Sequence, residues 1–125
     1  MMAPTSTNTT LDNALAAHAL WKTKLLAAVE SGEVLDVATI KRDDCCELGK
    51  WIYSDGKRTY GHKPEFLSLL VKHKEFHVIT GIVAGIVNGK DFESAKAMMG
   101  GSSQFGSASM DVGMAIIRLK KATVG

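Results

Sequence analysis

The sequence has only two cysteines, no cluster of basic residues and no long hydrophobic run, and each of these scarcities excludes a class of protein. Two adjacent thiols, Cys45 and Cys46, cannot form a framework of structural disulfides, and an ordinary trans peptide does not give neighbours the geometry to pair. The most apolar run, residues 78–87, is much shorter than the roughly 20 residues of a membrane-spanning helix. The 15 basic and 13 acidic residues are scattered along the chain. We therefore expect neither nucleic-acid binding nor membrane insertion.

The first ten residues are small and polar, and we expect residues 1–10 to be disordered. They carry neither the basic start nor the apolar core of a signal peptide, so the expected location is the cytoplasm. Residues 11–122 are expected to form one domain, because a chain of 125 residues is long enough to bury a single core. A free thiol in such a domain is a metal ligand, a redox-active group or a core residue.

Helical periodicity dominates the rest of the chain, which shows no strand-like alternation of useful length and no internal repeat. Apolar positions recur at helical spacing over residues 11–31, 36–53, 64–87 and 91–122. The last segment is interrupted near Gly100, and the pattern leaves open whether this break is a kink or a separation into two helices. The sequence therefore predicts an all-α, up-and-down four-helix bundle. It has four helices if the last segment is only kinked near Gly100, and five if that segment is divided.

Residues typical of helix ends support these segments. Asp36 and Asp91 are candidate N-caps, and Pro64 occupies the first position of the third helix. Gly32 is a candidate for the left-handed residue that ends the first helix. Gly49 falls inside the second predicted helix, where a glycine often permits the close approach of a neighbouring chain segment.

The third predicted helix carries two histidines, His73 and His77, one turn apart. Residues i and i+4 lie on one helical face, roughly 6 Å apart along the axis, so two imidazoles placed this way can share a metal ion. No glutamate follows the first histidine, which excludes the zinc-protease motif. A closed zinc site needs about four protein donors, so two more ligands are required.

Other predicted helices offer those donors. His18 lies on the inward face of the first helix, and either Cys45 or Cys46 lies on the inward face of the second. Only one of the two cysteines can point inward, because neighbours on a helix are about 100° apart, and periodicity does not choose between them. Three imidazoles and one thiolate form a set that suits tetrahedral zinc. The alternative is that the cysteine is simply a small buried hydrophobe.

The segment Cys46–Trp51 has the pattern C-x-L-G-x-W, which resembles the signature of the chemoreceptor zinc-binding (CZB) domain family. Further marks of that family follow the same order here: a histidine on the first helix near a tryptophan (His18 and Trp21), and an H-x-x-x-H pair with a phenylalanine before its second histidine. The resemblance extends over about residues 11–122.

The resemblance implies a zinc site formed by His18, Cys46, His73 and His77, with Cys45 as a neighbour that is not a ligand. It also implies a helical bundle that dimerises. Members of the family regulate chemoreceptors or diguanylate cyclases in bacteria, and some respond to zinc or to oxidants through the zinc-bound thiolate.

We therefore interpret the chain as a regulatory zinc-binding sensor domain in bacterial signalling. It would act on a chemoreceptor or cyclase output or as a free-standing module, as a homodimer that contacts a signalling protein. An enzyme is not expected, because four protein donors leave no open metal position and the Glu-x-x-His pairs of di-iron bundles are missing. The alternative is a metal-free structural or protein-interaction bundle.

Overall fold

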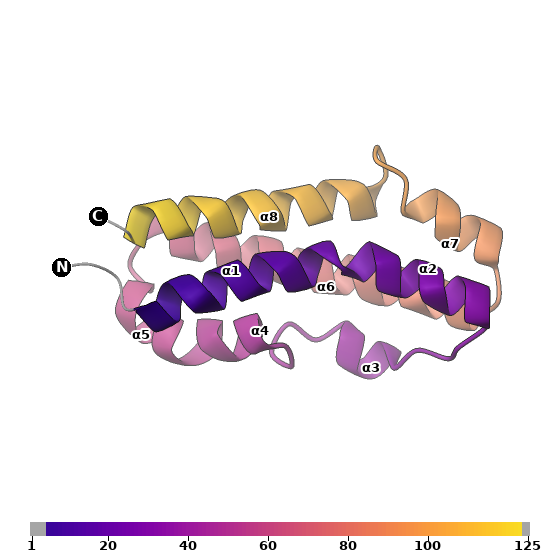
Figure 1. Ribbon diagram of the computed structural model, residues 1–125, viewed down its shortest axis with the longest axis horizontal. Coiled ribbons are helices and arrows are strands. Elements are labelled where there is room, and N and C mark those ends of the chain that lie inside the picture. The colour runs from indigo at the N-terminus through magenta and orange to yellow at the C-terminus, as the bar shows by residue number, and fades with distance from the viewer. Residues whose placement is uncertain (1–4, 124–125) are drawn as a thin grey trace.

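The structure, a computed structural model, describes residues 5–123, and within that range it contains helices and no strands. Figure 1 shows long helices that run side by side along one axis. The elements in chain order are α1 (Thr5–Ala19), α2 (Trp21–Ser31), α3 (Val37–Ile40), α4 (Glu47–Trp51), the π-helical segment η1 (Ile52–Gly56), α5 (Lys57–Tyr60), α6 (Pro64–Asn88), α7 (Phe92–Met98) and α8 (Gln104–Thr123).

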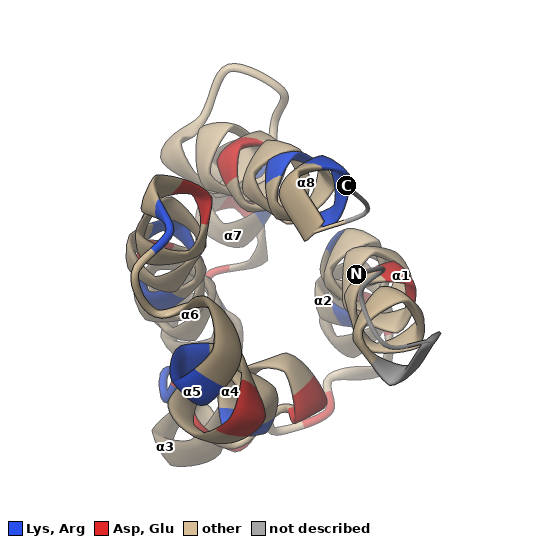
Figure 2. Ribbon diagram, turned by 90° about the vertical axis from the view of Figure 1, so that its left-hand side faces the viewer, with Lys and Arg blue, Asp and Glu red and all other residues tan. Residues whose placement is uncertain are grey.

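These elements form the four sides of a bundle. Viewed along the axis, α1 and α2 form one side, α3 to α5 the next, α6 the third, and α7 with α8 the fourth (Figure 2). Successive sides run in opposite directions along the axis (Figure 1). The predicted all-α, up-and-down bundle is confirmed. Its second side differs from a regular bundle, because it consists of several short helices.

The first side begins earlier than expected. Residues 1–10 were expected to be disordered, yet α1 starts at Thr5, so this prediction is wrong for residues 5–10; residues 1–4 lie outside the described range. Thr7 and Leu11 are 5% and 0% exposed, and burial on one helical face extends the helix toward the N-terminus. A one-residue break at Leu20 separates α1 from α2. Gly32, with φ of 72°, ends α2 as predicted.

The second side corrects the prediction of one helix over residues 36–53. Asp36 does cap a helix, since its carboxylate accepts the amide of Thr39, but that helix ends at Ile40. The chain then runs through a loop to Cys46, which is extended (φ −83°, ψ 165°) and caps α4. A Cβ on Gly49 would lie 1.8 Å from the carbonyl oxygen of Asp43. The predicted close approach at Gly49 is thus real, and the approaching segment is the loop that breaks the helix.

The third and fourth sides follow the sequence closely. Pro64 opens α6, which ends at Asn88, one residue past the predicted end. Asp91 caps α7 through the amide of Ser94. The break near Gly100 is a true separation, because residues 100–103 are non-helical and α8 begins only at Gln104.

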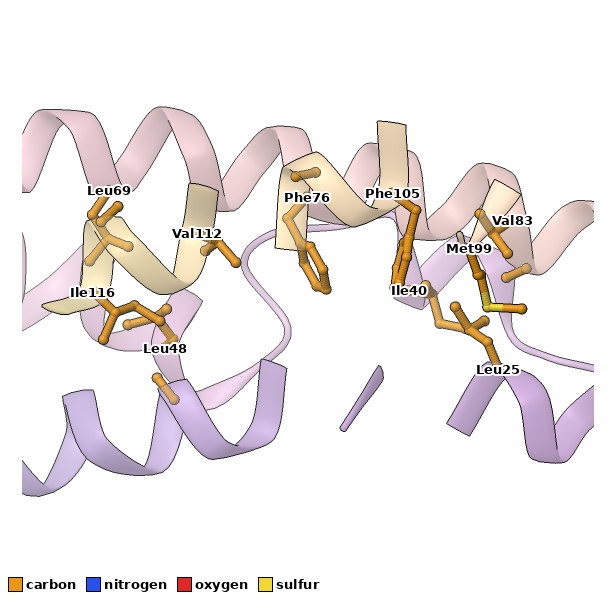
Figure 3. Packing of buried hydrophobic residues seen from close by; sticks show 14 of the residues in the cluster. Leu25, Ile40, Leu48, Leu69, Phe76, Val83, Met99, Phe105, Val112 and Ile116 are labelled. Carbon is orange, nitrogen blue, oxygen red and sulfur yellow. The ribbon is translucent and has the colours of Figure 1, made fainter. Parts of the chain in front are cut away.

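Apolar side chains fill the bundle along its length, and Phe76 of α6 lies near the middle of the labelled set in Figure 3. The Phe76 ring packs against Phe105 of α8, with centroids 5.8 Å apart, and against the imidazole of His18, at 5.4 Å. The buried imidazole of His18 therefore lies inside the apolar core, beside the fully buried ring of Phe76.

Ion pairs at the surface join neighbouring sides but contribute little. Lys120 of α8 pairs with Asp12 of α1, and Lys72 of α6 lies 3.8 Å from Asp111 of α8. These side chains are 39–54% exposed, and exposed pairs are each worth about 0–1 kcal/mol. Burial of apolar surface is the main stabilising term. None of the helices in residues 5–123 combines the length and hydropathy needed to traverse a lipid bilayer.

Candidate metal centre

Four side chains from three sides of the bundle converge in its interior. His18 comes from the last turn of α1, Cys46 from the N-cap of α4, and His73 and His77 from the middle of α6. Each residue offers one nitrogen or sulfur atom, and these four atoms all lie within 4.8 Å of one another. The structure thus brings together every residue of the set that the sequence and the family resemblance singled out.

Three of the donor atoms are especially close. The Nε2 atoms of His73 and His77 lie 3.0 Å apart, as expected for imidazoles one turn apart on the same helical face. The sulfur of Cys46 lies 3.3 Å from Nε2 of His73 and 3.6 Å from Nε2 of His77. The same sulfur accepts the backbone N–H of Gly49 at 3.3 Å. The cap that starts α4 therefore also orients the thiol toward the histidines.

Two backbone carbonyls orient the imidazoles. Nδ1 of His18 lies 2.7 Å from the carbonyl oxygen of Ala14, and Nδ1 of His77 lies 2.8 Å from that of Ile40. A carbonyl oxygen can only accept, so both Nδ1 atoms carry the hydrogen and donate it. Both Nε2 atoms then present lone pairs to the cluster. This arrangement is common in metal sites, where the second ring nitrogen fixes the orientation of the first.

The buried histidines are held in the neutral form. Burial lowers the pKa of His18 to about 4, and its hydrogen bond to Ala14 only partly offsets this effect. Burial, together with repulsion from His77 and His18, lowers the pKa of His73 to about 2. Burial also lowers the pKa of His77 and raises the pKa of the Cys46 thiol. At neutral pH, three uncharged imidazoles and one thiol therefore share this space.

This donor set fits a metal ion. Nε2 of His18 is buried and has no hydrogen-bond partner, although an unpaired buried polar atom costs about 1–3 kcal/mol. Nδ1 of His73 is likewise buried without a hydrogen-bond partner, so no contact to the backbone fixes the tautomer of this third imidazole, and its Nε2 is also available to a cation. A bound cation would also favour the thiolate form of Cys46, against the effect of burial. Nitrogen and sulfur donors of this kind suit a divalent transition metal.

Other candidate residues lie outside the cluster. Cys45, adjacent to Cys46, directs its sulfur toward the carboxylate of Asp44, 3.6 Å away. His62 is exposed. The structure thus agrees with the family resemblance in placing Cys46, and not Cys45, at the site. Helical periodicity had left this choice open because it assumed a continuous helix through both cysteines.

Comparison with known families also indicates a metal-binding domain. A family model described as "Chemoreceptor zinc-binding domain" matches residues 18–83, more than half of the chain, and this range contains all four converging residues. The chain belongs to the CZB domain family. This is a family of regulatory sensor domains and not of enzymes. Comparisons with curated proteins and with solved structures found no match.

Part of the helical bundle lies beyond the matched residues. Helices α7 and α8 follow residue 83, yet α8 packs along α6 and α1 and completes the fourth side of the bundle. Phe105, at the start of α8, contacts Phe76, which in turn contacts His18. The unmatched segment therefore reaches the centre indirectly, through Phe76, which contacts both Phe105 and His18.

Sequence reasoning missed the two backbone carbonyls that orient the imidazoles. Ala14 lies one turn before His18 on the same helix, so its carbonyl could have been proposed from spacing alone. Ile40 could not have been, because it was assigned to the interior of a helix in which its carbonyl would be occupied. The carbonyl is available to His77 because α3 ends at this residue.

Proposed function

We propose that this CZB domain is a regulatory zinc-binding module in which His18, Cys46, His73 and His77 hold one Zn²⁺ ion. The observation that carries the proposal is the convergence of four nitrogen and sulfur donors within 4.8 Å, with two imidazoles fixed in the tautomer that exposes Nε2. Four protein donors make a closed site, which favours a structural or sensing role over catalysis.

The spacing of three of the four donors is compatible with zinc. Zn–N bonds of about 2.05 Å and a Zn–S bond of about 2.3 Å, in tetrahedral geometry, place nitrogens about 3.3 Å apart and sulfur about 3.6 Å from each nitrogen. The observed N···N distance is 3.0 Å and the two S···N distances are 3.3 and 3.6 Å. These three distances agree with a tetrahedral zinc site to within about 0.3 Å, whereas the separations of the four donors extend to 4.8 Å, so His18 would move closer when the ion binds.

Binding or loss of zinc would change how firmly three sides of the bundle are held together. The ligands lie on α1, on the cap of α4 and on α6, so the ion links three sides that the chain itself connects only through loops. Binding to the folded state alone shifts the equilibrium toward that state. His18 lies two residues before the helix break at Leu20, so loss of zinc frees α1 to move relative to α6.

Oxidation of Cys46 is a second input that we include in the proposal. A peroxide converts a thiolate to a sulfenic acid with release of hydroxide, and the sulfur then loses its ability to bind zinc strongly. Cys46 is partly exposed, unlike the buried histidines, so an oxidant can reach it. The output would be a chemoreceptor, a diguanylate cyclase or another signalling partner in the bacterial cytoplasm.

Self-association is proposed on a separate observation. Along α6, the side chains of Leu67, Val71, Val78 and Ile82 are about half exposed, although they are apolar. Their spacing of four, seven and four residues places them on one stripe of the helix, as in a heptad seam. An exposed apolar stripe of this kind is typical of an interface. We propose that two copies of the chain pack through this stripe as a homodimer.

Elemental analysis tests the zinc proposal. Protein purified without added metal is expected to carry about one zinc per chain, the number that one four-donor site can hold. The competing function, a metal-free interaction bundle, predicts no bound zinc and no effect of a chelator on the folded state. A stoichiometry near zero after incubation with zinc at micromolar concentration would exclude the proposed module.

A further inference from the structure

A cavity of about 440 Å³ lies beside the centre, between α1 and the segment formed by α4 and η1. On the α1 side its lining includes Ala14, Ala17 and His18, and on the other side Cys46 and Trp51. These two elements lie side by side in the bundle (Figure 1). The cavity thus extends from the surface to two of the four residues of the centre.

The four residues of the centre differ in their exposure to solvent, and the most exposed of them, Cys46, lines the cavity. His73 and His77 are 0% and 2% exposed, and neither lines the cavity. His18 lines it but is only 4% exposed. Cys46 lines it and is partly exposed, because it caps a short helix at the end of a loop. An ion approaching along this path meets the sulfur before it meets the imidazoles of α6.

From this arrangement we propose that the cavity between α1 and α4 is the route by which the metal ion enters and leaves the centre, with Cys46 as the first ligand bound and the last released. The proposal rests on the zinc-binding function argued above. A divalent ion with six water molecules would take up about 180 Å³, at about 30 Å³ for each water, which is less than the volume of the cavity.

Ala17 lines the proposed route next to His18. It is exposed on α1, immediately before His18, and its methyl group is one of the smallest side chains of the lining. A larger side chain at this position is expected to narrow the path, and residue 17 is not itself one of the four donors. Ala16 is the matched control, because it is also exposed on α1 but does not line the cavity.

The test measures zinc transfer in both directions for the wild type and for the variants Ala17→Phe and Ala16→Phe. Release is followed by transfer to a chromophoric chelator, and loading is followed by competition with the same chelator. Ala17→Phe is expected to slow loading and release by the same factor, severalfold or more, and to leave the dissociation constant unchanged. Ala16→Phe is expected to match the wild type in both rates.

Three results would overturn the route. Equal rates in the two variants would show that the cavity is not used, and a changed dissociation constant with unchanged release would show that residue 17 acts on the centre itself. If Ala17→Phe does not fold, Ala17→Leu replaces it, and wild-type rates in that variant would reject the proposal. A wild-type protein that binds no zinc would instead refute the function on which the route rests.

Discussion

His77 donates its Nδ1–H to the carbonyl oxygen of Ile40, 2.8 Å away, and this bond joins α6 to the last residue of α3. The bond points Nε2 of His77 toward the centre. It also fixes the position of Ile40, from which a loop leads to Cys46. One hydrogen bond therefore helps to position two donors that are 31 residues apart in the sequence.

Removal of the sulfur donor should abolish the site, whereas removal of its neighbour should not. Cys46→Ala is expected to reduce bound zinc well below one per chain, because three imidazoles then lack the thiolate that neutralises half of the ion's charge. Cys45→Ala is the matched control and should retain full stoichiometry, since its sulfur points to Asp44. Elemental analysis of both proteins is the measurement. Equal zinc content in the two variants would contradict the ligand set.

Loss of metal should lower stability by an amount that depends on free zinc. The free energy of unfolding is expected to fall when a chelator is added, and zinc at 100 times its dissociation constant contributes about 2.7 kcal/mol. Thermal unfolding with zinc and with excess chelator measures the effect. His73→Ala should remove most of the difference between the two conditions. If the melting temperature of the wild type is unaffected by chelator, zinc has no role in holding the bundle together.

Gly49 should tolerate no side chain. A Cβ at this position would lie 1.8 Å from the carbonyl oxygen of Asp43, so Gly49→Ala must displace the loop that carries Cys46. We expect a loss of about 1–3 kcal/mol in the free energy of unfolding, together with weaker zinc binding.

Gly113→Ala is the control for that substitution. Its added Cβ meets only the Cδ1 atom of Leu15, at an ordinary 3.6 Å, so this variant should be more stable by up to about 1 kcal/mol, as alanine is in a helix. Denaturant unfolding compares the two proteins. A Gly49→Ala protein as stable as the wild type would mean that the loop does not pack against α4 as described.

The metal-free protein should lose stability as the solution is acidified. The folded-state pKa of His18 is lowered to about 4 and that of His73 to about 2, from ordinary values of 6.5. Below pH 6.5 the unfolded chain therefore binds protons that the folded chain does not, and the free energy of unfolding falls with falling pH. Above that pH both states are neutral at these residues, and their contribution is fully present.

Denaturant unfolding at several pH values between about 7.5 and 5.5, in the presence of chelator, tests this expectation in a range where carboxylates stay ionised. His62→Gln is measured beside the wild type, because His62 is exposed and lies outside the centre. A flat profile for the wild type would show that these histidines are not held neutral in the fold.

A charge on the apolar stripe of α6 should disrupt self-association. Val78→Lys is expected to convert a homodimer into a monomer, because a lysine in the middle of an apolar interface would lose its hydration. Val34→Lys is the control: Val34 is 74% exposed but lies in the loop after α2, away from the stripe. Light scattering after size-exclusion chromatography gives the mass of each variant. A monomeric wild type, or dimers in both variants, would reject this interface.

Some features of this CZB domain follow from local patterns in the sequence. The i,i+4 spacing of His73 and His77 places both rings on one face of any helix, and Pro64 marks the start of the helix that carries them. Asp36, Asp91 and Gly32 act at helix ends as predicted, because capping depends on residues only a few positions away.

Other features depend on contacts between distant segments. Residues 36–53 have the composition of one continuous helix, yet the structure divides them into several pieces, with Cys46 at an N-cap. The packing of Asp43 against Gly49 and the bond from His77 to Ile40 make the broken form possible. Helical periodicity therefore could not choose between Cys45 and Cys46, since the choice depends on where the helix starts again.

The chain alone determined that it would form helices, and that three histidines and one of two adjacent cysteines were candidate donors, because helical spacing and donor chemistry are local properties. Tertiary structure decided which thiol faces the histidines, which carbonyls orient the imidazoles and from which side an ion can approach. Each of these depends on the position of one segment against another, and such contacts leave no trace in the periodicity of either segment.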